Sequence, residues 1–434
     1  MSTPPAYSIA VRSFATTLLL LVGLAAPARA EPRVVLLTMG PGDALYTRFG
    51  HAALLVEDGR LATVYNYGYT DFRDSDLVWS FLRGRARFWV ARASYRATLR
   101  DYVLEDRTLY RQPLTLAPAQ AAELARLLAW GAREENRYYV YHHFRDNCST
   151  RLRDLLNRVT GGALARRLRG SPGPEATLRD LVRQGFAGRL DLLLVTDLFL
   201  GRSVDRRLDA WDAAFLPREL RRSVQDTGLA PATRVVYRRR GPSPFAGCDP
   251  HAGVKLLWGL AGLGLLLALV LVLWPRRRVA GAALAPLSLL CGLPGLAIWS
   301  IVALATLPDL RFNEISLSLW PTDLALLWPA GRWLRGRAWA GRLLRGYLGL
   351  RLAALGLVLL GNLTGLLIQR PLSWLALGVT LILGAHLAVR GLPRNPQRPA
   401  GSERGPLPAQ GRATETGGSD GDQAADPAGP LQGV

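Results

Sequence analysis

Long apolar stretches dominate the second half of the chain, and they limit the possible folds more than any other feature. Five such stretches follow residue 252 in the 434-residue sequence, and one crossing of a bilayer needs about 20 apolar residues. The first is GVKLLWGLAGLGLLLALVLVLWP and the last is LSWLALGVTLILGAHLAV. The third is the weakest, because it contains Asp323 and two prolines. We therefore predict an all-α bundle of about five transmembrane helices over residues 252–390.

The positions of the arginines predict how this bundle is oriented. Cytoplasmic loops of membrane proteins carry an excess of Arg and Lys. The arginine clusters lie at 276–278, at 332–345 and after Val389. If the N-terminal part lies outside, these clusters all fall inside, and the outer loops contain only Arg311 and Arg370. The sequence thus predicts a multi-pass protein of the inner (cytoplasmic) membrane, with its N-terminal part on the periplasmic, extracytoplasmic side.

The two ends of the chain differ in composition from the rest. Residues 1–30 contain a basic residue, an apolar run and a final Ala-Arg-Ala, the pattern of a signal peptide cut before Glu31. An uncleaved anchor is the alternative. Residues 391–434 are rich in Pro, Gly, Ser and Gln, so they cannot bury a core and are predicted to be a disordered cytoplasmic tail. Residues 31–251 are left as an extracytoplasmic domain of strands and helices.

The charge and the motifs that are missing exclude several classes of function. The formal net charge is +21 and comes almost wholly from arginine, yet these arginines form neither a recognition helix nor an RNA-binding motif. Many lie at the ends of apolar stretches, where a membrane explains them better. The sequence has no H-E-x-x-H or C-x-x-C and no nucleotide-binding glycine pattern. We predict a membrane partner, no nucleic acid, no metal and no cofactor.

One cysteine stands at a position that favours chemistry. In FRDNCSTRLRDLL, Cys148 follows Asp146 and Asn147, which are both good N-caps, at the start of an amphipathic helix. The unpaired N–H groups and the dipole of a helix N-terminus favour negative charge and lower the pKa of a thiol. The same N–H groups can hold the oxyanion of a tetrahedral intermediate. Cys148 is therefore a candidate nucleophile.

A cysteine nucleophile needs a base, and histidine is the usual one. The chain up to residue 247 contains three histidines. His51 follows a glycine, which leaves room for a substrate beside the imidazole. His142 and His143 precede the cysteine on an extended segment that would carry at least one of them away. His51 is the predicted partner.

Two structural roles for Cys148 compete with catalysis. Cys148 falls on the same helix stripe as Leu152 and Leu155, so it is equally well explained as a core residue. A disulfide with Cys248 is the other alternative, because the predicted compartment is oxidising.

Several stretches together resemble the Lnb N-terminal periplasmic domain family, also known as a domain of unknown function. They are GDALYTRFGHAALLVED, VYNYGYTDF, YHHFRDNCSTRLRDLL, GRSVDRRLDAWDAAFLPREL and RFNEISLSLWP. The resemblance covers about residues 33–220, with a looser match in the membrane part. Family members with a membrane-embedded C-terminal half are similar to bacterial lipoprotein N-acyltransferases.

The resemblance implies a fold and a set of catalytic roles. The order of histidine before cysteine is similar to circularly permuted NlpC/P60 and lecithin:retinol acyltransferase-like proteins, so an α+β papain-like domain is expected. In that class the cysteine opens a helix and the histidine lies on a strand, which implies Cys148 as nucleophile and His51 as base and acid. The third catalytic residue comes from the next strand, where VYNYG offers Asn66. The alternative for Asn66 is a turn-forming role, and in that case Asp71 would be the third catalytic residue.

Other residues are candidates for substrate binding. Tyr46 is predicted to line the site. Asn313 and Glu314 lie before the third stretch, where polar groups near membrane depth predict binding of a head group or of an acceptor amine. An exposed interfacial loop is the alternative for them. Arg202 and Asp205 are predicted to form a structural ion pair.

The resemblance also implies the reaction. A fatty acyl chain would pass from a phospholipid to Cys148 as a thioester, and then to the N-terminal amine of diacylglyceryl-cysteine in a lipoprotein. The expected partners are thus a phospholipid donor and a lipoprotein acceptor. A cysteine peptidase or amidase, a phospholipase, and a non-catalytic membrane-anchored binding domain are the alternatives.

Overall fold

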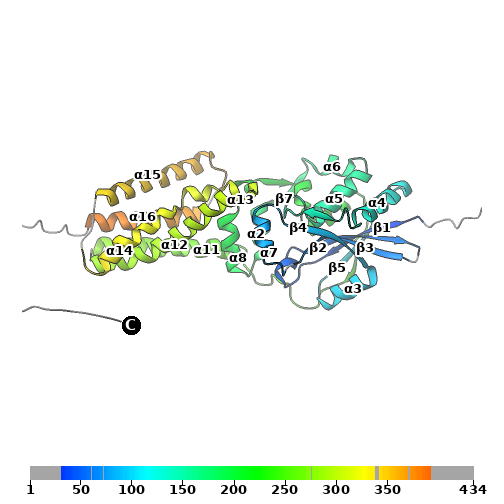
Figure 1. Cartoon of the computed structure of the whole chain (residues 1–434), viewed down its shortest axis with the longest axis horizontal. Helices are drawn as coiled ribbons and strands as arrows, with labels where there is room; N and C mark the ends of the chain where they lie inside the picture. Colours follow the sequence, from blue (N-terminus) through cyan, green and yellow to red (C-terminus); the bar gives the residue numbers. More distant parts are fainter. Residues whose placement is uncertain are drawn as a thin grey trace, which may run out of the picture. The chain divides into compact units, whose positions relative to one another are not determined.

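The structure is a computed structural model that describes residues 31–59, 61–71, 73–274, 276–337, 342–369 and 372–391. The predicted signal peptide lies outside the described residues, and so does the predicted tail apart from Gly391. The described part consists of an α+β N-terminal region followed by a helical C-terminal region (Figure 1). This division into two structural classes is the one that the sequence predicts.

A seven-stranded antiparallel sheet forms the centre of the N-terminal region. Its strands, in spatial order, are β6 (Tyr138–Val140), β4 (Arg87–Ser94), β3 (Leu61–Tyr69), β2 (His51–Asp58), β1 (Arg33–Met39), β5 (Leu109–Pro113) and β9 (Arg234–Tyr237). The strand expected to carry His51 is β2, and the next strand, with Asn66, is β3; the two lie side by side. β1 and β2 are buried along most of their length, which explains their nearly continuous apolar sequences.

Helices cover both faces of this sheet (Figure 1). The helices that do so are α3 (Tyr95–Leu104) on one face, and α4 (Pro118–Gly131), α5 (Cys148–Val159) and α10 (Pro217–Asp226) on the other. Val35 and Leu37 of β1 point toward α3, whereas Leu36 points toward the three helices opposite. Burying a leucine side chain stabilises a fold by about 1.5–3 kcal/mol. Successive side chains of β1 therefore contribute alternately to the two hydrophobic cores, one on each face of the sheet.

Other short elements of the N-terminal region lie between β3 and β4 or between α5 and α10 in the chain. They are α2 (Leu77–Leu82), α6 (Ala163–Leu168), β7 (Pro172–Thr177), α7 (Leu178–Phe186), α8 (Leu190–Phe199), η2 (Arg202–Asp205), β8 (Arg207–Asp209) and α9 (Ala210–Ala213). β7 and β8 form a separate two-stranded sheet. Their own buried cluster includes Leu181, Val204, Leu208 and Phe215.

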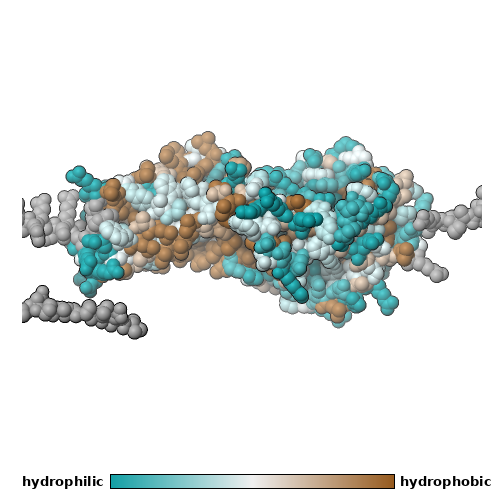
Figure 2. Space-filling model, in the orientation of Figure 1, coloured by the Kyte–Doolittle hydropathy of each residue, from teal (hydrophilic) through white to brown (hydrophobic). Residues whose placement is uncertain are grey.

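Within the described ranges, four helices of the C-terminal region are long and apolar enough to cross a membrane. They are α11 (Ala252–Leu273), α12 (Arg277–Leu304), α15 (Arg342–Thr364) and α16 (Leu372–Gly391). Figure 2 shows hydrophobic residues over much of this region, and Leu266, Leu357 and Leu360 are more than half exposed. Such outward-facing leucines suit contact with lipid rather than water.

The third predicted span is not a single helix, so the expectation of about five transmembrane helices is too high by one for the described residues. Between α12 and α15 the chain instead forms α13 (Pro308–Arg311), η3 (Glu314–Leu317), η4 (Pro321–Leu326) and α14 (Leu327–Leu334). Pro308 and Pro321 each stand at the start of a new piece. Proline lacks an N–H and so disrupts a continuous helix, which explains the interruption.

These pieces nevertheless return along α12. A Cβ built on Gly295 would lie 2.8 Å from the carbonyl carbon of Trp320, and one on Gly281 would lie 2.6 Å from Ala330 O. Contacts therefore move toward the start of α12 as the returning segment advances, so the two run antiparallel. Small residues permit this close backbone approach between membrane helices. The segment spans much of the length of α12 without being one helix.

Candidate active site

Helix α5 begins at Cys148 because Asn147 caps it. Asn147 Oδ1 accepts hydrogen bonds from the backbone N–H groups of Ser149 and Thr150, both at 2.9 Å, and Thr150 Oγ1 accepts from Asn147 N at 2.7 Å. The side-chain amide of Asn147 also donates to the carbonyl oxygen of Phe215 at 3.0 Å. This reciprocal capping box fixes the first turn of the helix. It also attaches the cysteine turn to the segment that follows α9.

The Cys148 side chain is half-buried and lies at the first turn of α5. The backbone N–H groups of Ala52, Ser149 and Cys148 itself lie beside the sulfur, and Ser149 Oγ lies 3.9 Å from Sγ. These groups favour the thiolate. Burial has the larger effect, however, and raises the pKa of Cys148 above its ordinary value. The predicted lowering of the thiol pKa is therefore wrong, because a dry surrounding outweighs the helix N-terminus.

His51 is the first residue of β2 and follows Gly50, whose φ is +81°. Its Nε2 lies 3.3 Å from Oδ1 of Asn66 on the adjacent strand β3. Asn66 is 3% exposed and pairs with Ala53 and Ala91 on the strands at either side. An amide oxygen in this position accepts a hydrogen from Nε2 and so leaves Nδ1 as the unprotonated, basic nitrogen.

His51 and Asn66 lie on neighbouring strands, as the family resemblance implies. Asp71, the substitute for Asn66, lies in an exposed turn where Oδ1 accepts from Arg73 N at 2.9 Å. The structure thus brings Asn66, and not Asp71, to the imidazole. Among the hydrogen bonds of the described residues none joins Cys148 Sγ to His51. Catalytic hydrogen bonds are often long before a substrate binds.

A cavity of about 730 Å³ contains both Cys148 and His51. Almost all its other walls are aliphatic or aromatic; they come from Leu45, Tyr46, Phe49, Leu77, Val78, Phe81, Phe88, Tyr141, Phe186, Leu192, Phe215, Leu216 and Pro217. Tyr46 lines this cavity and is 63% exposed, so it stands at the mouth. The cavity is large enough for a flexible apolar chain and offers few polar groups besides the two candidate catalytic side chains.

Gly68 makes room for the cysteine at the end of β3. It has a φ of +96°, and a Cβ built on it would lie 3.6 Å from Cys148 Cβ. The β3–β4 pairing shifts its register between Asn66 and Tyr69, which marks a bulge. Bulges redirect side chains next to functional sites. Here the bulge allows the N-terminus of α5 to approach the sheet beside His51.

A second histidine, His143, also lines the cavity, and sequence reasoning did not select it. Its ring meets the edge of Phe49 at a centroid distance of 4.9 Å, and Nδ1 lies 3.4 Å from the Tyr141 hydroxyl. Its neighbour His142 points elsewhere, with Nε2 at 3.2 Å from Asp309 Oδ2. The sequence did contain a signal for this: in two consecutive histidines on an extended segment, the side chains point to opposite sides, so one of them could face the cavity.

Burial makes both imidazoles in the cavity poor bases for a free proton. It lowers the pKa of His51 to about 4, with nearby Arg107 acting in the same direction and the Asn66 hydrogen bond opposing it. Burial and the neighbouring His142 lower the pKa of His143 to about 4 as well. With the thiol pKa raised, the resting pair is a neutral thiol and a neutral imidazole. The thiol proton would therefore move to His51 only as the sulfur attacks.

This state of the resting pair predicts the pH dependence of the first half-reaction. We expect kcat/KM to fall only as the pH drops through about 4, because protonated His51 cannot accept the thiol proton. A burst assay that follows release of the first product over pH 3–8 measures this. His143 shares the same pKa, so a His143→Gln variant serves as the control and should keep the acid limb. An acid limb near the ordinary histidine pKa of about 6.5 would contradict the assignment.

The Asn66 hydrogen bond predicts a further variant. Asn66→Ala should lower kcat on the order of 10²-fold with little change in KM, because the imidazole loses the group that orients it. Asn66→Asp keeps an acceptor for Nε2 and should retain more activity, with the acid limb moved to higher pH by the added negative charge. Asp71→Ala is the matched control and should behave as the unmodified chain. Equal losses in the Asn66 and Asp71 variants would refute an orienting role.

Asn313 and Glu314, the other predicted binding residues, are both buried and do not line this cavity. Asn313 Nδ2 donates to Leu198 O at 2.7 Å, and Glu314 Oε2 accepts from Gln369 N at 2.8 Å. Glu314 also pairs with Arg202 at 3.3 Å. These bonds hold the loops at the ends of α8 and α15 together. In this structure the two side chains connect segments of the chain to one another.

Two other structural expectations are wrong. The three cysteines are all free, so the alternative of a Cys148–Cys248 disulfide does not hold. Arg202 and Asp205 do not pair with each other either: Arg202 pairs with Glu314, and Asp205 accepts from Arg179 Nε at 2.7 Å. Each of the two residues pairs with a residue that is distant in the sequence, so their closeness in the sequence was a misleading guide to pairing.

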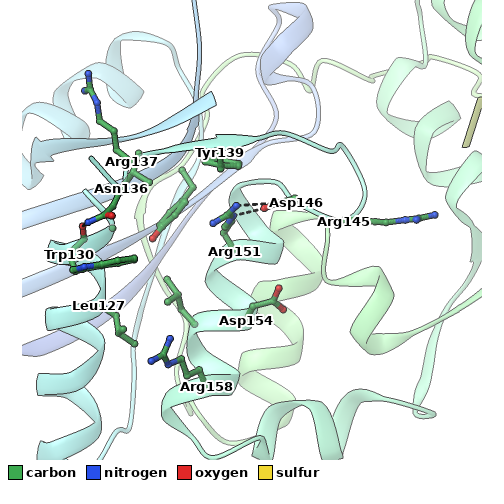
Figure 3. A pocket seen from close by; sticks show the side chains of 14 residues that line it. Leu127, Trp130, Asn136, Arg137, Tyr139, Arg145, Asp146, Arg151, Asp154 and Arg158 are labelled. Atoms are coloured by element: carbon green, nitrogen blue, oxygen red, sulfur yellow. Dashed lines mark hydrogen bonds and ion pairs between the residues drawn. The ribbon is translucent and has the colours of Figure 1, made fainter. Parts of the chain in front are cut away.

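A different cavity beside α5 is lined by charged side chains as well as apolar and aromatic ones (Figure 3). It measures about 410 Å³, and its lining includes Trp130 of α4, Arg137 just before β6, Tyr139 of β6, and Asp154 and Arg158 of α5. Figure 3 shows the paired Arg151 and Asp146 at its centre. Neither Cys148 nor His51 lines it. The two cavities are thus distinct, and charged side chains of α5 line only the second.

Comparison with known proteins identifies part of the chain. The sequence model of the Lnb N-terminal periplasmic domain family matches residues 27–184, a range that contains His51, Asn66 and Cys148. No curated protein and no solved structure matches the chain. The match over residues 27–184 confirms the resemblance to this family that the sequence motifs indicate.

Proposed function

We propose that this protein is a thiol acyltransferase of lipoprotein biosynthesis. It moves a fatty acyl chain from a phospholipid, through a thioester on Cys148, to the N-terminal amine of diacylglyceryl-cysteine in lipoproteins. The observation that supports this most is the placement of Cys148 and the His51–Asn66 pair in one apolar cavity of about 730 Å³. A peptide or sugar substrate would present polar groups that these walls cannot satisfy.

The first half-reaction forms the thioester. Cys148 Sγ attacks the ester carbonyl of the phospholipid while His51 takes the thiol proton. The backbone N–H of Cys148, at the start of α5, is the proposed donor to the oxyanion, because those of Ser149 and Thr150 are already bonded to Asn147. When the tetrahedral intermediate collapses, the ester C–O bond breaks. The His51 imidazolium then protonates the leaving alkoxide, which departs as a lysophospholipid.

The second half-reaction transfers the chain. The neutral α-amine of the acceptor attacks the thioester carbonyl, the C–S bond breaks and an amide forms. His51 accepts the proton that the amine nitrogen loses and returns it to the sulfur, so the thiol and the neutral imidazole are restored. Thioesters react with amines more readily than oxygen esters do. An apolar cavity also keeps water away, which favours aminolysis over hydrolysis.

Access from a membrane supports a lipid donor. Helix α2 reaches the helical region, where Thr306 N donates to Leu82 O at 3.4 Å. The cavity mouth carries exposed Leu45, Tyr46 and Val78, and Val78 lies on α2 itself. Apolar side chains at a mouth beside membrane helices suit lateral passage of an acyl chain from the bilayer. We place this mouth at the periplasmic surface of the inner membrane, as the arginine distribution predicts.

The proposed fold class is consistent with this chemistry. A cysteine at a helix N-terminus, packed against an antiparallel sheet that carries the histidine and then the amide on adjacent strands, follows the order expected of a permuted papain-like domain. We propose that the domain extends from residue 31 to about residue 251, with the transmembrane domain from 252 to 390. Within this scheme Tyr46 binds substrate at the mouth, and Asn313 and Glu314 stabilise the junction.

Trapping the acyl-enzyme tests the proposal. Full-length protein in liposomes that contain a phospholipid with an isotopically labelled acyl chain should gain one acyl mass on Cys148, removable by hydroxylamine. Adding a diacylglyceryl-cysteine peptide should discharge the label as an amide on its α-amine. Discharge to free fatty acid at the same rate with and without the peptide would indicate a phospholipase. Absence of any adduct together with cleavage of cell-wall peptides would indicate a peptidase, and absence of both a binding domain.

A further inference from the structure

A second large cavity lies at the junction of the two regions and does not include the cysteine site. It measures about 760 Å³. Residues 177–183 at the start of α7 contribute to it, whereas Phe186 at the end of α7 lines the catalytic cavity. The nine residues of α7 extend about 13 Å, so the two cavities lie toward opposite ends of this helix.

One wall of this cavity, the apolar wall, comes from the helical region. Its residues are Val254 and Trp258 of α11, Ile315 of η3, Leu367 and Ile368 after α15, and Leu372 and Trp374 of α16. Apart from Ile315, all of them lie at or just beyond the ends of the long apolar helices that face the N-terminal region. A wall of this composition, at the level of the membrane surface, suits the upper part of an acyl chain. Tryptophan is enriched at this depth because its ring is apolar and its N–H is polar.

The opposite wall, the polar wall, is charged, and most of its charges are already paired. Arg179 pairs with Asp205 at 2.7 Å, and Arg183 pairs with Asp197 at 2.8 Å. Asp180 is also occupied, accepting from Thr177 Oγ1 at 2.8 Å and from Arg183 at 3.3 Å.

Arg207 is the exception on this wall: it is exposed and has no ion pair among the described residues. His251 also contributes to this wall. The polar wall has three arginines and three aspartates, so its formal charges balance, and Arg207 is the arginine that no ion pair among the described residues engages.

Trp374 provides an independent sign of a ligand. Its side chain is 6% exposed, and its indole Nε1 has no hydrogen-bond partner within the described part of the chain. It lines this cavity. Buried donors in folded proteins are nearly always bonded, and an unmet one is costly. A bound molecule with a carbonyl or phosphate oxygen would satisfy this N–H.

We propose that this junction cavity binds one phospholipid molecule. The phosphate lies beside Arg207 and His251, an ester carbonyl accepts from Trp374 Nε1, and the start of the acyl chains follows the apolar wall. The diacylglyceryl group of a lipoprotein shares the esters and the chains but lacks the phosphate. The unpaired cation is what favours the phospholipid. The site lies apart from Cys148, so it does not depend on the proposed reaction.

Binding measurements on a Cys148→Ala background test this site without any turnover of the lipid. The full-length protein, delipidated in mild detergent, is titrated with a short-chain phosphatidylglycerol and followed by native mass spectrometry. We expect one lipid per chain. Trp374→Phe removes the N–H together with the five-membered ring of the indole and should weaken binding about tenfold, the equivalent of about 1.4 kcal/mol. Arg207→Gln should weaken binding of phosphatidylglycerol but leave that of diacylglycerol unchanged.

Control variants and a folding measurement distinguish loss of the lipid site from unfolding of the protein. Trp274→Phe alters an exposed tryptophan outside the cavity and should bind as the background does. Thermal unfolding of each variant without lipid shows whether it is folded. Equal affinity of the Trp374→Phe variant and the background would overturn the site. Tighter binding of a diacylglyceryl-cysteine peptide than of phosphatidylglycerol would overturn the assignment to phospholipid and indicate the acceptor instead. Loss of N-acylation alone, with lipid binding intact, would count against the proposed function only.

Discussion

Replacing Cys148 by alanine is expected to lower acyl transfer on the order of 10⁴-fold or more, since the covalent route disappears with the sulfur. His51→Ala should cost about 10²–10⁴-fold, the usual contribution of a general base. The measurement is the rate at which a labelled acyl chain appears on the α-amine of a diacylglyceryl-cysteine peptide in liposomes. Lipoprotein N-termini from cells that rely on each variant give the same comparison by mass spectrometry.

His143 is the matched control for this prediction, because it lines the same cavity and has the same lowered pKa. It has a tyrosine and three phenylalanines as neighbours, and among the described residues no side-chain amide accepts a hydrogen bond from its ring. His143→Gln should therefore change the rate by less than about tenfold. If His143→Gln abolished transfer and His51→Ala did not, the base would be His143, and the role of Asn66 would have to be withdrawn.

Breaking the buried ion pair of the helical region is expected to cause the largest loss of stability. Arg351 Nε and Nη2 donate to Asp323 at 3.0 and 2.7 Å, and both side chains are completely buried. The hydroxyl of Tyr347 donates to the same carboxylate at 2.6 Å. Arg351→Met would leave Asp323 charged and without its main partner. Removing one member of such a pair costs about 3–5 kcal/mol.

Thermal unfolding in detergent, followed by tryptophan fluorescence, measures this loss. The double variant Asp323→Leu with Arg351→Met should recover most of it, because apolar replacement of a whole buried pair is often neutral. Arg189→Gln breaks the exposed Arg189–Asp191 pair and should leave the unfolding temperature unchanged. Unfolding of the Arg351→Met variant at the unmodified temperature would mean that the pair contributes nothing to stability.

This ion pair also shows why the third span could be only partly predicted. The sequence marks the segment as weak, since it contains Asp323 and two prolines. It does not reveal that Arg351, 28 residues later on α15, neutralises the carboxylate inside the bundle. With its charge compensated there, the segment can return along α12 as short helical pieces. By contrast, the other four spans and strands β1–β3 were predictable, because their apolar patterns are local.

The candidate site likewise has features that the sequence predicted and features that it could not predict. Cys148, His51 and Asn66 could be selected from local motifs and from the family resemblance, and the structure brings His51 and Asn66 together. The apolar cavity could not be predicted, since Phe81, Phe186 and Phe215 meet from distant parts of the sequence. The pKa of Cys148 was missed for the same reason, because dryness is a property of the assembled walls. Local capping rules describe only the helix N-terminus.

The cap of α5 has a consequence for engineering selectivity. Asn147 uses one end of its amide to start the helix and the other to hold the carbonyl of Phe215, a wall residue of the apolar cavity. Reshaping the wall at Phe215 would therefore disturb the aim of the nucleophile as well as the room for the chain. Phe186 and Leu192 line the same space without that attachment. Altered acyl-length preference should be sought at those two positions, where pocket dimensions can vary while reactivity is preserved.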